Sequence, residues 1–281
     1  MKDEAKEFEI SAMAVMEALE LPLVEIERWN CCGTVFSLTE DDLMHQLASI
    51  RNFIRVQEAG SDEIVTSCAM CYNTLKRSSL FVNHAEERLE KINAFMDEEV
   101  AYEGKVEVRH ILEIIRDRIG WEKVEEAMIY PLEGLSVAPY YGCMLLRPRQ
   151  VGIDDPDNPT IMRDLIDALW ATPVEYAFQA ECCGSYQVVD HRELIVERTH
   201  RILSSARRAG ADVVVTSCPL CQYNLRETQS ELKEKIPTYE EMPVMYFTQL
   251  MAVALDVDSG ELPSPLLARL SVGEGVGKGE G

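Results

Sequence analysis

In the stretch Val214-Val215-Thr216-Ser217-Cys218-Pro219-Leu220-Cys221, a run of β-branched residues leads directly into a Cys-x-x-Cys pair. The chain carries a second copy, Ile64-Val65-Thr66-Ser67-Cys68-Ala69-Met70-Cys71, 150 residues earlier. Each copy predicts a short strand followed by a helix, with the cysteine pair at the N-terminus of that helix. That position lowers the pKa of a thiol and favours the thiolate that metals bind.

A second cysteine motif is duplicated in the same way. Cys31-Cys32-Gly33 precedes the first Cys-x-x-Cys, and Cys182-Cys183-Gly184 precedes the second, at an offset of 151 residues. Thiolates are the ligands that hold iron–sulfur clusters and zinc, whereas core packing has no specific need of cysteine. We therefore interpret the chain as two copies of one metal-binding module. Buried thiols or a dithiol–disulfide active site would leave the repeated Cys-Cys pairs unexplained.

Composition narrows the class of protein. The chain has 281 residues, 47% of them apolar, and a formal net charge of −22. The negative charge argues against nucleic-acid binding; it indicates either a soluble surface or an acidic face that docks a basic partner. No apolar run approaches the length of a membrane span, and the N-terminus lacks the apolar stretch of a signal peptide. We expect a cytoplasmic protein, in which cysteines serve as metal ligands more often than as structural disulfides.

Strands and helices are expected to alternate in both copies, which is typical of a parallel α/β sheet. Apolar spacing predicts the helices 9–20, 40–59, 73–82 and 110–119 in the first copy, and 160–170, 191–209, 223–235 and 248–255 in the second. The strands are expected at 22–26, 63–66 and 106–109, and at 173–177, 212–216 and 243–246. Ligands of such sheets lie beyond the carboxyl ends of the strands, where both cysteine motifs fall.

The repeat also predicts the domain organisation. We expect an N-terminal module with four cysteines over residues 1–131 and a C-terminal module with five over residues 132–268. A boundary falls at Pro131-Leu132-Glu133-Gly134. Residues 269–281 are glycine-rich and are expected to be a flexible tail.

The ninth cysteine, Cys143, has no counterpart. It follows a predicted strand and turn, Leu135-Ser-Val-Ala-Pro-Tyr-Tyr-Gly142, and 38 residues separate it from Cys182. The equivalent position of the first copy would fall before Met1, so that module is expected to lack its opening strand and its leading cysteine. Either the chain start lies too far downstream, or the first site is built differently.

These motifs resemble a known family. The pattern Cys-x38-Cys-Cys-x34-Cys-x2-Cys of the second module is similar to the cysteine-rich CCG domain. Two such domains in tandem, the second opened by Tyr140-Tyr141-Gly142-Cys143, resemble the B subunit of heterodisulfide reductase and its relatives. The resemblance extends from Glu7 to Asp256. It implies a fold of two pseudo-repeated Rossmann-like modules with short parallel sheets.

The resemblance also implies a function. In the family, each five-cysteine set binds a non-cubane [4Fe-4S] cluster, and a disulfide between two small thiols is cleaved between the two clusters. By position, the cluster that meets substrate sulfur would be held by Cys143, Cys182, Cys183, Cys218 and Cys221. The first module would use Cys31, Cys32, Cys68 and Cys71, which suit an incomplete non-cubane cluster, a four-cysteine [4Fe-4S] cluster, or zinc.

The expected protein is thus an oxidoreductase subunit that reduces, or in reverse forms, a disulfide such as that of coenzymes M and B. The chain has no Gly-x-Gly-x-x-Gly fingerprint, so flavin or nicotinamide should be bound by a partner. The resemblance therefore implies an iron–sulfur subunit and a flavoprotein subunit as partners. The alternative is a non-catalytic electron-transfer or anchoring subunit of another complex, with one cluster and one zinc or degenerate site.

Residues near the motifs receive less specific interpretations. His110 is expected to be a structural residue at a helix start, with a counterpart near Phe247 or Thr248, or else a proton donor near the site. Arg147 and Arg149, close behind Cys143, suit either an anionic substrate or the surface. Four tyrosines beside the cysteine motifs are expected to shield a cluster from water: Tyr140, Tyr141, Tyr186 and Tyr223.

Overall fold

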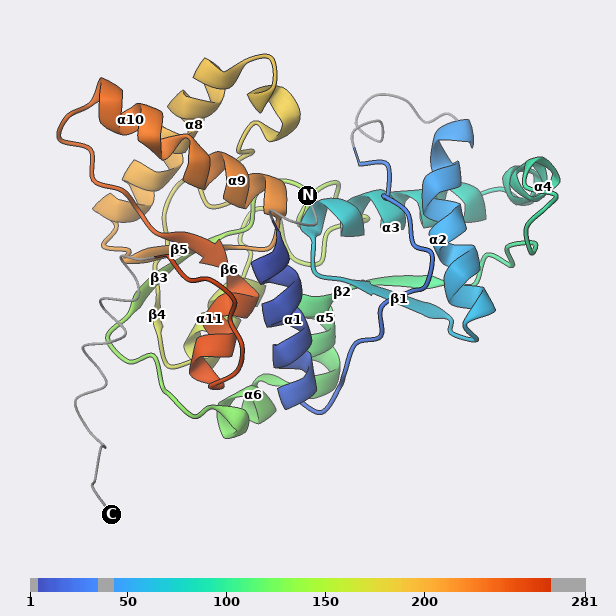
Figure 1. Cartoon of the computed structure of the whole chain (residues 1–281), viewed down its shortest axis with the longest axis horizontal. Helices are drawn as coiled ribbons and strands as arrows, with labels where there is room; N and C mark the ends of the chain where they lie inside the picture. Colours follow the sequence, from blue (N-terminus) through green and yellow to red (C-terminus); the bar gives the residue numbers. More distant parts are fainter. Residues whose placement is uncertain (1–4, 35–42, 264–281) are drawn as a thin grey trace. The chain divides into compact units, whose positions relative to one another are not determined.

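The computed structural model describes residues 5–34 and 43–263. Within these residues it contains a two-stranded sheet, β1-β2, and a four-stranded sheet in the order β4-β3-β5-β6 (Figure 1). Every strand pair is parallel, and helices connect the strands. The predicted α/β class with two pseudo-repeated modules is confirmed.

The four-stranded sheet consists of β3 (Ser136–Tyr140), β4 (Thr172–Pro173), β5 (Val213–Thr216) and β6 (Val244–Tyr246). The valines of β5 are fully buried, as expected for a central strand of a parallel sheet that is covered on both faces. In the register, Thr216 lies opposite Tyr140 on one side and Tyr246 on the other. Three strands therefore end at the same level, and the residues that follow them are delivered to one edge.

The two-stranded sheet repeats part of this arrangement. Strand β1 (Glu63–Thr66) pairs with β2 (Glu107–His110), and Thr66 lies opposite His110. This register matches that of Thr216 and Tyr246, so the counterpart of His110 is Tyr246. The position predicted from the sequence, near Phe247 or Thr248, was wrong by one or two residues, because β2 extends one residue further than expected.

Two predicted strands differ from the structure. Residues 22–26 form no strand, and the strand predicted at 173–177 is reduced to the two residues of β4. In the C-terminal sheet β4 pairs only with β3. The described residues of the N-terminal sheet contain no counterpart of β3, so the segment equivalent to β4 has no strand to pair with.

The helices follow the predicted order, with two that were not predicted, α4 and α6. The α-helices are α1 (Lys6–Ala18), α2 (Leu47–Glu58), α3 (Ala69–Asn83), α4 (Glu86–Phe95), α5 (Ile111–Ile114), α6 (Trp121–Ala127), α7 (Ile161–Ala168), α8 (Arg192–Arg208), α9 (Pro219–Glu227), α10 (Gln229–Lys235) and α11 (Phe247–Ala254). Short helical turns of other types are η2 (Leu43–Gln46), η3 (Ile115–Ile119) and η4 (Ser185–Val188). None of the described helices is both long and apolar enough to cross a membrane.

The chain forms two compact units that are not continuous in sequence. Among the described residues, one unit consists of 5–22, 121–142 and 162–263 and contains the four-stranded sheet; it is here called the C-terminal unit. The other, here called the N-terminal unit, consists of 23–34, 43–120 and 143–161 and contains the two-stranded sheet. The predicted boundary between 131 and 132 stays a prediction about the sequence repeat, since contacts divide the chain elsewhere. The predicted tail, 269–281, lies outside the described residues, as does the start of the helix predicted at 40–59.

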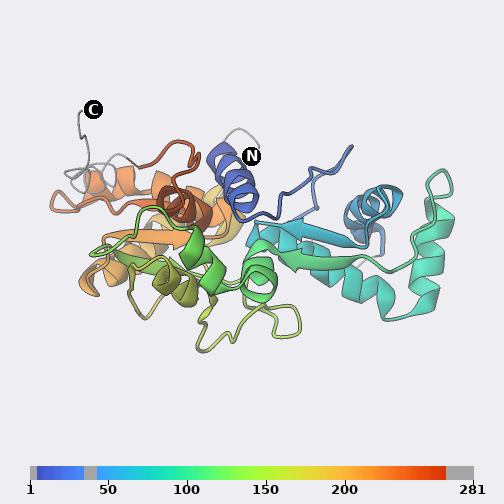
Figure 2. The ribbon, with the colours of Figure 1, turned by 90° about the horizontal axis from the view of Figure 1, so that it is seen from below.

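Helix α1 belongs to the unit of the four-stranded sheet, although it precedes the first cysteine motif. It lies side by side with α11 in both views (Figures 1 and 2). The Phe8 ring stacks on Tyr246 with centroids 4.1 Å apart, and the buried hydroxyls of Ser11 and Thr248 are 2.7 Å apart. These contacts attach the N-terminal helix to the C-terminal sheet.

Candidate metal centre

The cysteines of the C-terminal unit converge at the edge where the strands end. Cys218 follows β5 and is the N-cap residue of α9, which places Cys221 in the first turn of that helix. The Cys183 and Cys221 Sγ atoms are 3.4 Å apart, and both residues are buried. The predicted meeting of the Cys-Cys-Gly turn with the Cys-x-x-Cys pair is therefore observed.

The Cys-Cys-Gly turn presents its sulfurs through the backbone. Gly184 has a φ of 97°, a value that favours glycine, and its N–H donates to Cys182 Sγ at 3.3 Å. The Ser185 N–H donates to Cys183 Sγ at 3.4 Å. Backbone donors of this kind stabilise negative charge on sulfur, which suits thiolate ligands.

Strand β3 brings a further residue to this edge. Gly142 has a φ of 63°, and a Cβ atom there would lie 3.3 Å from Cys221 Sγ. A side chain at this position would crowd the sulfur, which explains the glycine in the Tyr-Tyr-Gly-Cys motif. Cys143 is the next residue and is half-buried. Its role as a fifth ligand stays a prediction.

Hydrogen bonds between thiols, together with burial, raise the pKa of two cysteines at this site. The pKa of Cys183 is raised to about 12, first by its hydrogen bond with Cys182 and further by desolvation. Hydrogen bonds with Cys183 and Cys218, together with burial, raise the pKa of Cys221. Since a metal binds the thiolate, loading this site must release protons, and its affinity for metal must rise with pH.

Several buried polar atoms around these cysteines have no hydrogen-bond partner among the described residues. They are the hydroxyl oxygens of Ser185, Thr216 and Ser217 and the Oδ1 atom of Asn224. Leaving a buried polar group unsatisfied costs about 1–3 kcal/mol. The inorganic sulfides of an iron–sulfur cluster accept hydrogen bonds, so the residues present fit such a group better than a closed apolar core.

Asn224 supports the same turn from α9. Its Nδ2 donates to the Ser185 carbonyl at 2.8 Å and to Cys183 Sγ at 3.4 Å. The side chain thus fixes the turn and one sulfur together. Sequence reasoning missed Asn224 and the three hydroxyls, although the repeated Val-Thr-Ser-Cys and Tyr-Asn motifs contain three of these four residues.

The cysteines of the N-terminal copy form another, similar centre, here called the first centre, and the centre of Cys182, Cys183, Cys218 and Cys221 is called the second centre. Cys68 is the N-cap residue of α3, and its Sγ accepts from the Cys71 N–H at 3.5 Å. The Cys32 and Cys71 Sγ atoms are 3.3 Å apart, and the Thr34 hydroxyl is 2.9 Å from Cys32 Sγ. The hydrogen bond with Cys71 lowers the pKa of Cys32, although burial opposes it.

The first Cys-Cys pair is held against α2. Asn30 and Asn52 exchange two hydrogen bonds, of 3.0 Å and 2.9 Å, and the Ser49 hydroxyl donates to the Cys32 carbonyl at 3.2 Å. Cys31 is exposed, whereas each of the other cysteines is buried or half-buried. This centre therefore reaches the solvent at Cys31.

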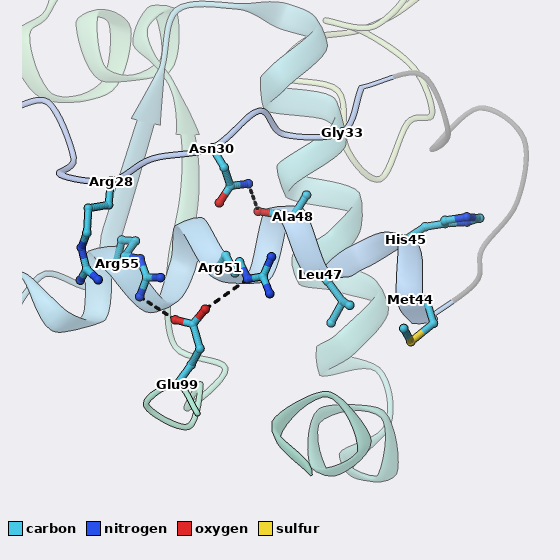
Figure 3. Close-up of a pocket in the computed structure, with 10 residues that line it drawn as sticks. All are labelled: Arg28, Asn30, Gly33, Met44, His45, Leu47, Ala48, Arg51, Arg55 and Glu99. Atoms are coloured by element: carbon cyan, nitrogen blue, oxygen red, sulfur yellow. Dashed lines mark hydrogen bonds and ion pairs between the residues drawn. The ribbon is translucent and has the colours of Figure 1, made fainter. Parts of the chain in front are cut away.

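A cavity of about 670 Å³ adjoins this pair (Figure 3). Arg28, Arg51 and Arg55 line it, but their charge is largely compensated by Glu58 and Glu99. Arg55 and Arg51 both reach Glu99, at 2.6 Å and 3.1 Å. The cavity is thus a ring of ion pairs and does not carry a strong positive field.

The segment after Cys143 packs on α3. Asn73 Nδ2 donates to the carbonyls of Met144 and Arg147 at 2.7 Å each, and the Tyr72 hydroxyl donates to the Val151 carbonyl at 2.9 Å. A second cavity, of about 530 Å³, lies here and is lined by Arg147 and Arg149 among others. Arg149 pairs with Asp155 and Asp157. Binding of an anion by these arginines stays a prediction.

His110 is structural in this fold. It is fully buried at the end of β2, and its Nδ1 accepts from the Leu112 N–H at 3.2 Å while Glu113 accepts from the His110 N–H at 2.8 Å. Burial lowers its pKa to about 3, so the ring is neutral at physiological pH. Tyr140 is also fully buried, and its hydroxyl donates to the Glu181 carbonyl at 2.7 Å.

The described residues include no group of three or more His, Cys, Asp or Glu side chains arranged to hold a single metal ion. A cluster makes a different demand, since its thiolates bind separate irons. The sulfurs here meet in pairs, Cys183 with Cys221 and Cys32 with Cys71.

Comparison with known proteins agrees with this geometry. The model of the cysteine-rich CCG domain matches residues 1–76 and 137–226, which together hold both centres. The chain belongs to the CCG cysteine-rich domain family. The resemblance to the heterodisulfide reductase B subunit inferred from the cysteine spacing is confirmed at this level.

Full-length relatives are similar at about 30% identity. The 8-methylmenaquinol:fumarate reductase membrane anchor subunit of Wolinella succinogenes is 30% identical, covering 90% of this chain and 88% of its own length. The B subunit of the ferredoxin/F(420)H(2)-dependent CoB-CoM heterodisulfide reductase of Methanosarcina acetivorans is 30% identical over 88% of this chain and 83% of its own. A protein of Archaeoglobus profundus, named as similar to the heterodisulfide reductase B subunit, is 29% identical over 89% and 86%.

A solved structure supports the fold alone. The crystal structure of a hypothetical protein from Helicobacter pylori matches with a TM-score of 0.72 at 12% identity. The match covers 96% of this chain and 48% of the other.

Proposed function

We propose that this chain is the catalytic iron–sulfur subunit of a heterodisulfide-reductase-like complex. The relatives named above as B subunits of that reductase support the assignment over most of the chain length. The observation that carries it is the second centre, where converging buried sulfurs are accompanied by unsatisfied hydroxyls at one sheet edge. A structural thiol cluster would have no need of those hydroxyls.

In this proposal Cys143, Cys182, Cys183, Cys218 and Cys221 hold a non-cubane [4Fe-4S] cluster. Cys31, Cys32, Cys68 and Cys71 hold a [4Fe-4S] cluster, with zinc as the alternative for that site. When bound, the clusters deliver electrons singly and offer iron to substrate sulfur. The overall reaction consumes one disulfide, two electrons and two protons and yields two thiols.

The protein residues have defined tasks in this reaction. In this proposal the fully buried Tyr140 keeps water away from the second centre. The Gly184 and Ser185 N–H groups stabilise negative charge on Cys182 and Cys183. The sequence has no nucleotide fingerprint, so we assign flavin to a partner flavoprotein subunit and electron delivery to a partner iron–sulfur subunit.

A second function has specific support. The Wolinella succinogenes relative is named a membrane anchor subunit, and the first module of this chain has four cysteines where the family pattern has five. An electron-transfer or anchoring subunit would need the clusters to carry electrons but would not need them to bind substrate. The two functions differ in whether the chain itself cleaves a disulfide.

An assay of disulfide reduction distinguishes them. The chain is produced anaerobically with iron and sulfide, reduced with viologen dye, and given the coenzyme M–coenzyme B disulfide. Catalytic function predicts the release of two thiols for each disulfide consumed, and loss of this activity in Cys218→Ser. A chain that takes up electrons from the dye but releases no thiol would be an electron-transfer subunit.

A further inference from the structure

We propose that the hydroxyls of Ser185, Thr216 and Ser217, here called the hydroxyl set, donate hydrogen bonds to sulfur atoms of the cluster in the second centre and raise its reduction potential. The inference rests on the proposed function, because it requires that centre to hold an iron–sulfur cluster. It assigns a role to three residues that are not ligands themselves.

The hydroxyl set is buried and lacks protein partners. Thr216 and Ser217 are fully buried and Ser185 is 8% exposed, and none of the three oxygens has a partner among the described residues. Bulk solvent does not reach these hydroxyls. Each buried hydroxyl without a partner destabilises the fold, and three of them lie within one unit. An acceptor at this place removes that cost.

The three residues lie next to the cysteines of the second centre in the sequence. Ser185 follows Cys183 by two residues, Thr216 precedes Cys218 by two, and Ser217 is its direct neighbour. All three therefore flank the ligands of one centre. By contrast, two pairs of buried hydroxyls in the same unit have protein partners: Ser11 contacts Thr248 at 2.7 Å, and Thr228 contacts Thr199 at 2.9 Å. The buried Tyr176 hydroxyl, which does not flank a cysteine motif, has no partner among the described residues.

The N-terminal sheet provides an internal comparison. Thr34 occupies the position of Ser185 in the first Cys-Cys-Gly motif, and its hydroxyl is 2.9 Å from Cys32 Sγ. Thr66, the counterpart of Thr216, accepts from the Cys68 N–H at 3.3 Å. At these two positions the first copy satisfies the hydroxyls within the protein, whereas the second leaves them available for another acceptor.

The backbone of Ser185 gives independent support. Its φ of 53° lies in the left-handed region, which glycine tolerates better than serine. A serine at this position is therefore strained relative to glycine. Donation by its hydroxyl to cluster sulfur would offset that cost.

Hydrogen bonds to cluster sulfur stabilise the reduced state, since reduction places more negative charge on the sulfurs. Removing one donor should therefore lower the reduction potential of the cluster. We expect roughly a tenfold change in the reduction equilibrium for each variant, equivalent to about 59 mV for a one-electron couple.

The test is a dye-mediated redox titration of the iron-loaded full chain, followed by electron paramagnetic resonance. The signal of the second centre is the one that Cys218→Ser abolishes. The variants are Ser185→Ala, Thr216→Val and Ser217→Ala, with Ser185→Gly added because glycine suits the φ of 53° and keeps the turn unstrained. Ser11→Ala is the matched control, a buried serine whose hydroxyl already has partners.

A lower potential in the hydroxyl-set variants, with full iron content and an unchanged potential in Ser11→Ala, supports the inference. Full iron content with unchanged potentials in all four variants overturns it while leaving the proposed function intact. A wild-type chain that takes up no iron in the second centre would overturn the proposed function itself, and the inference with it.

Discussion

In the C-terminal unit Asn224 holds the Cys-Cys-Gly turn, bonding to the Ser185 carbonyl and to Cys183 Sγ. In the N-terminal unit the corresponding residue, Asn73 of α3, donates instead to the carbonyls of Met144 and Arg147, in the segment after Cys143. The two copies thus share a motif but use one of its residues for different purposes.

The surroundings of the two centres differ as well. Three strands end together at the second centre, and its sulfurs are largely buried. The first centre lies on a two-stranded sheet and exposes Cys31. The cysteine motif is thus the same in both copies, while the copy with more strands around it encloses its sulfurs better. The exposed centre suits electron entry, and the enclosed centre suits chemistry that must exclude water.

The largest contrast should come from the cysteines. Cys218→Ser and Cys68→Ser each remove one ligand from one centre, and each should lose the iron of its own centre, about half of the total for two similar clusters. Cys218→Ser should also abolish thiol release from the disulfide, whereas Cys68→Ser should slow it, because the proposed reaction draws its electrons through the first centre. Iron analysis and the viologen assay check this. The assignment of the second centre would be contradicted if Cys218→Ser kept all of its iron, or if both variants lost the same fraction of activity.

The next largest difference between the two copies should come from substitution of Asn224 and of its counterpart Asn73. Asn224→Ala and Asn73→Ala each leave buried acceptors without a donor, and each should lower the free energy of unfolding by about 1–3 kcal/mol. Asn224→Ala should also change the resonance signal of the second centre. Asn73→Ala should instead increase hydrogen exchange at residues 144–152. Identical effects of the two variants on both measurements would show that the copies do not differ as described.

A smaller contrast concerns His110, whose counterpart in the other copy is a tyrosine, Tyr246. The folded pKa of His110 is about 3, below its ordinary value of 6.5. The unfolded chain therefore binds a proton between these values that the folded chain excludes, and stability falls as the pH decreases from 6.5 toward 3. This contribution has a slope of up to about 1.4 kcal/mol per pH unit.

His110→Asn keeps an N-cap acceptor but cannot titrate. We expect a flatter acid limb in denaturant unfolding between pH 6 and about 4, a window set by the depressed pKa. An unchanged slope in His110→Asn would mean that the buried ring is already protonated.

The smallest effect should come from Tyr72→Phe. Its hydroxyl donates to the Val151 carbonyl, and its loss should cost about 1 kcal/mol, the net contribution of a typical hydrogen bond. Thermal unfolding measures this cost, and Tyr102→Phe, which removes a hydroxyl from the same unit, gives a comparison. No effect in Tyr72→Phe would mean that the segment after Cys143 is not anchored at this point.

Much of this architecture was predictable because the repeat aligns both copies. The strands 63–66, 213–216 and 244–246 and the position of each Cys-x-x-Cys at a helix N-terminus follow from β-branched runs and helical spacing. The strand predicted at 22–26 was wrong. The apolar residues of this segment favour a strand, but a strand forms only when a neighbouring strand pairs with it, and the sequence of the segment itself contains no information about that neighbour. Single segments cannot reveal a missing partner.

The surroundings of the centres were less predictable. Ser185 and Asn224 meet across nearly 40 residues of chain, a contact that depends on the tertiary arrangement of η4 and α9. The packing of α1 against α11 was also not predicted, because the apolar face of a helix does not indicate which other element it will pack against. In contrast, the pairing of cysteines was foreseen, since strand ends of a parallel sheet meet at one edge.

The most direct test of the central claim is an anaerobic analysis of iron, acid-labile sulfide and zinc in the purified chain. Two cluster-binding centres predict about eight irons per chain with a matching amount of sulfide and no zinc. About four irons with one zinc would make the first centre structural and contradict the two-cluster account.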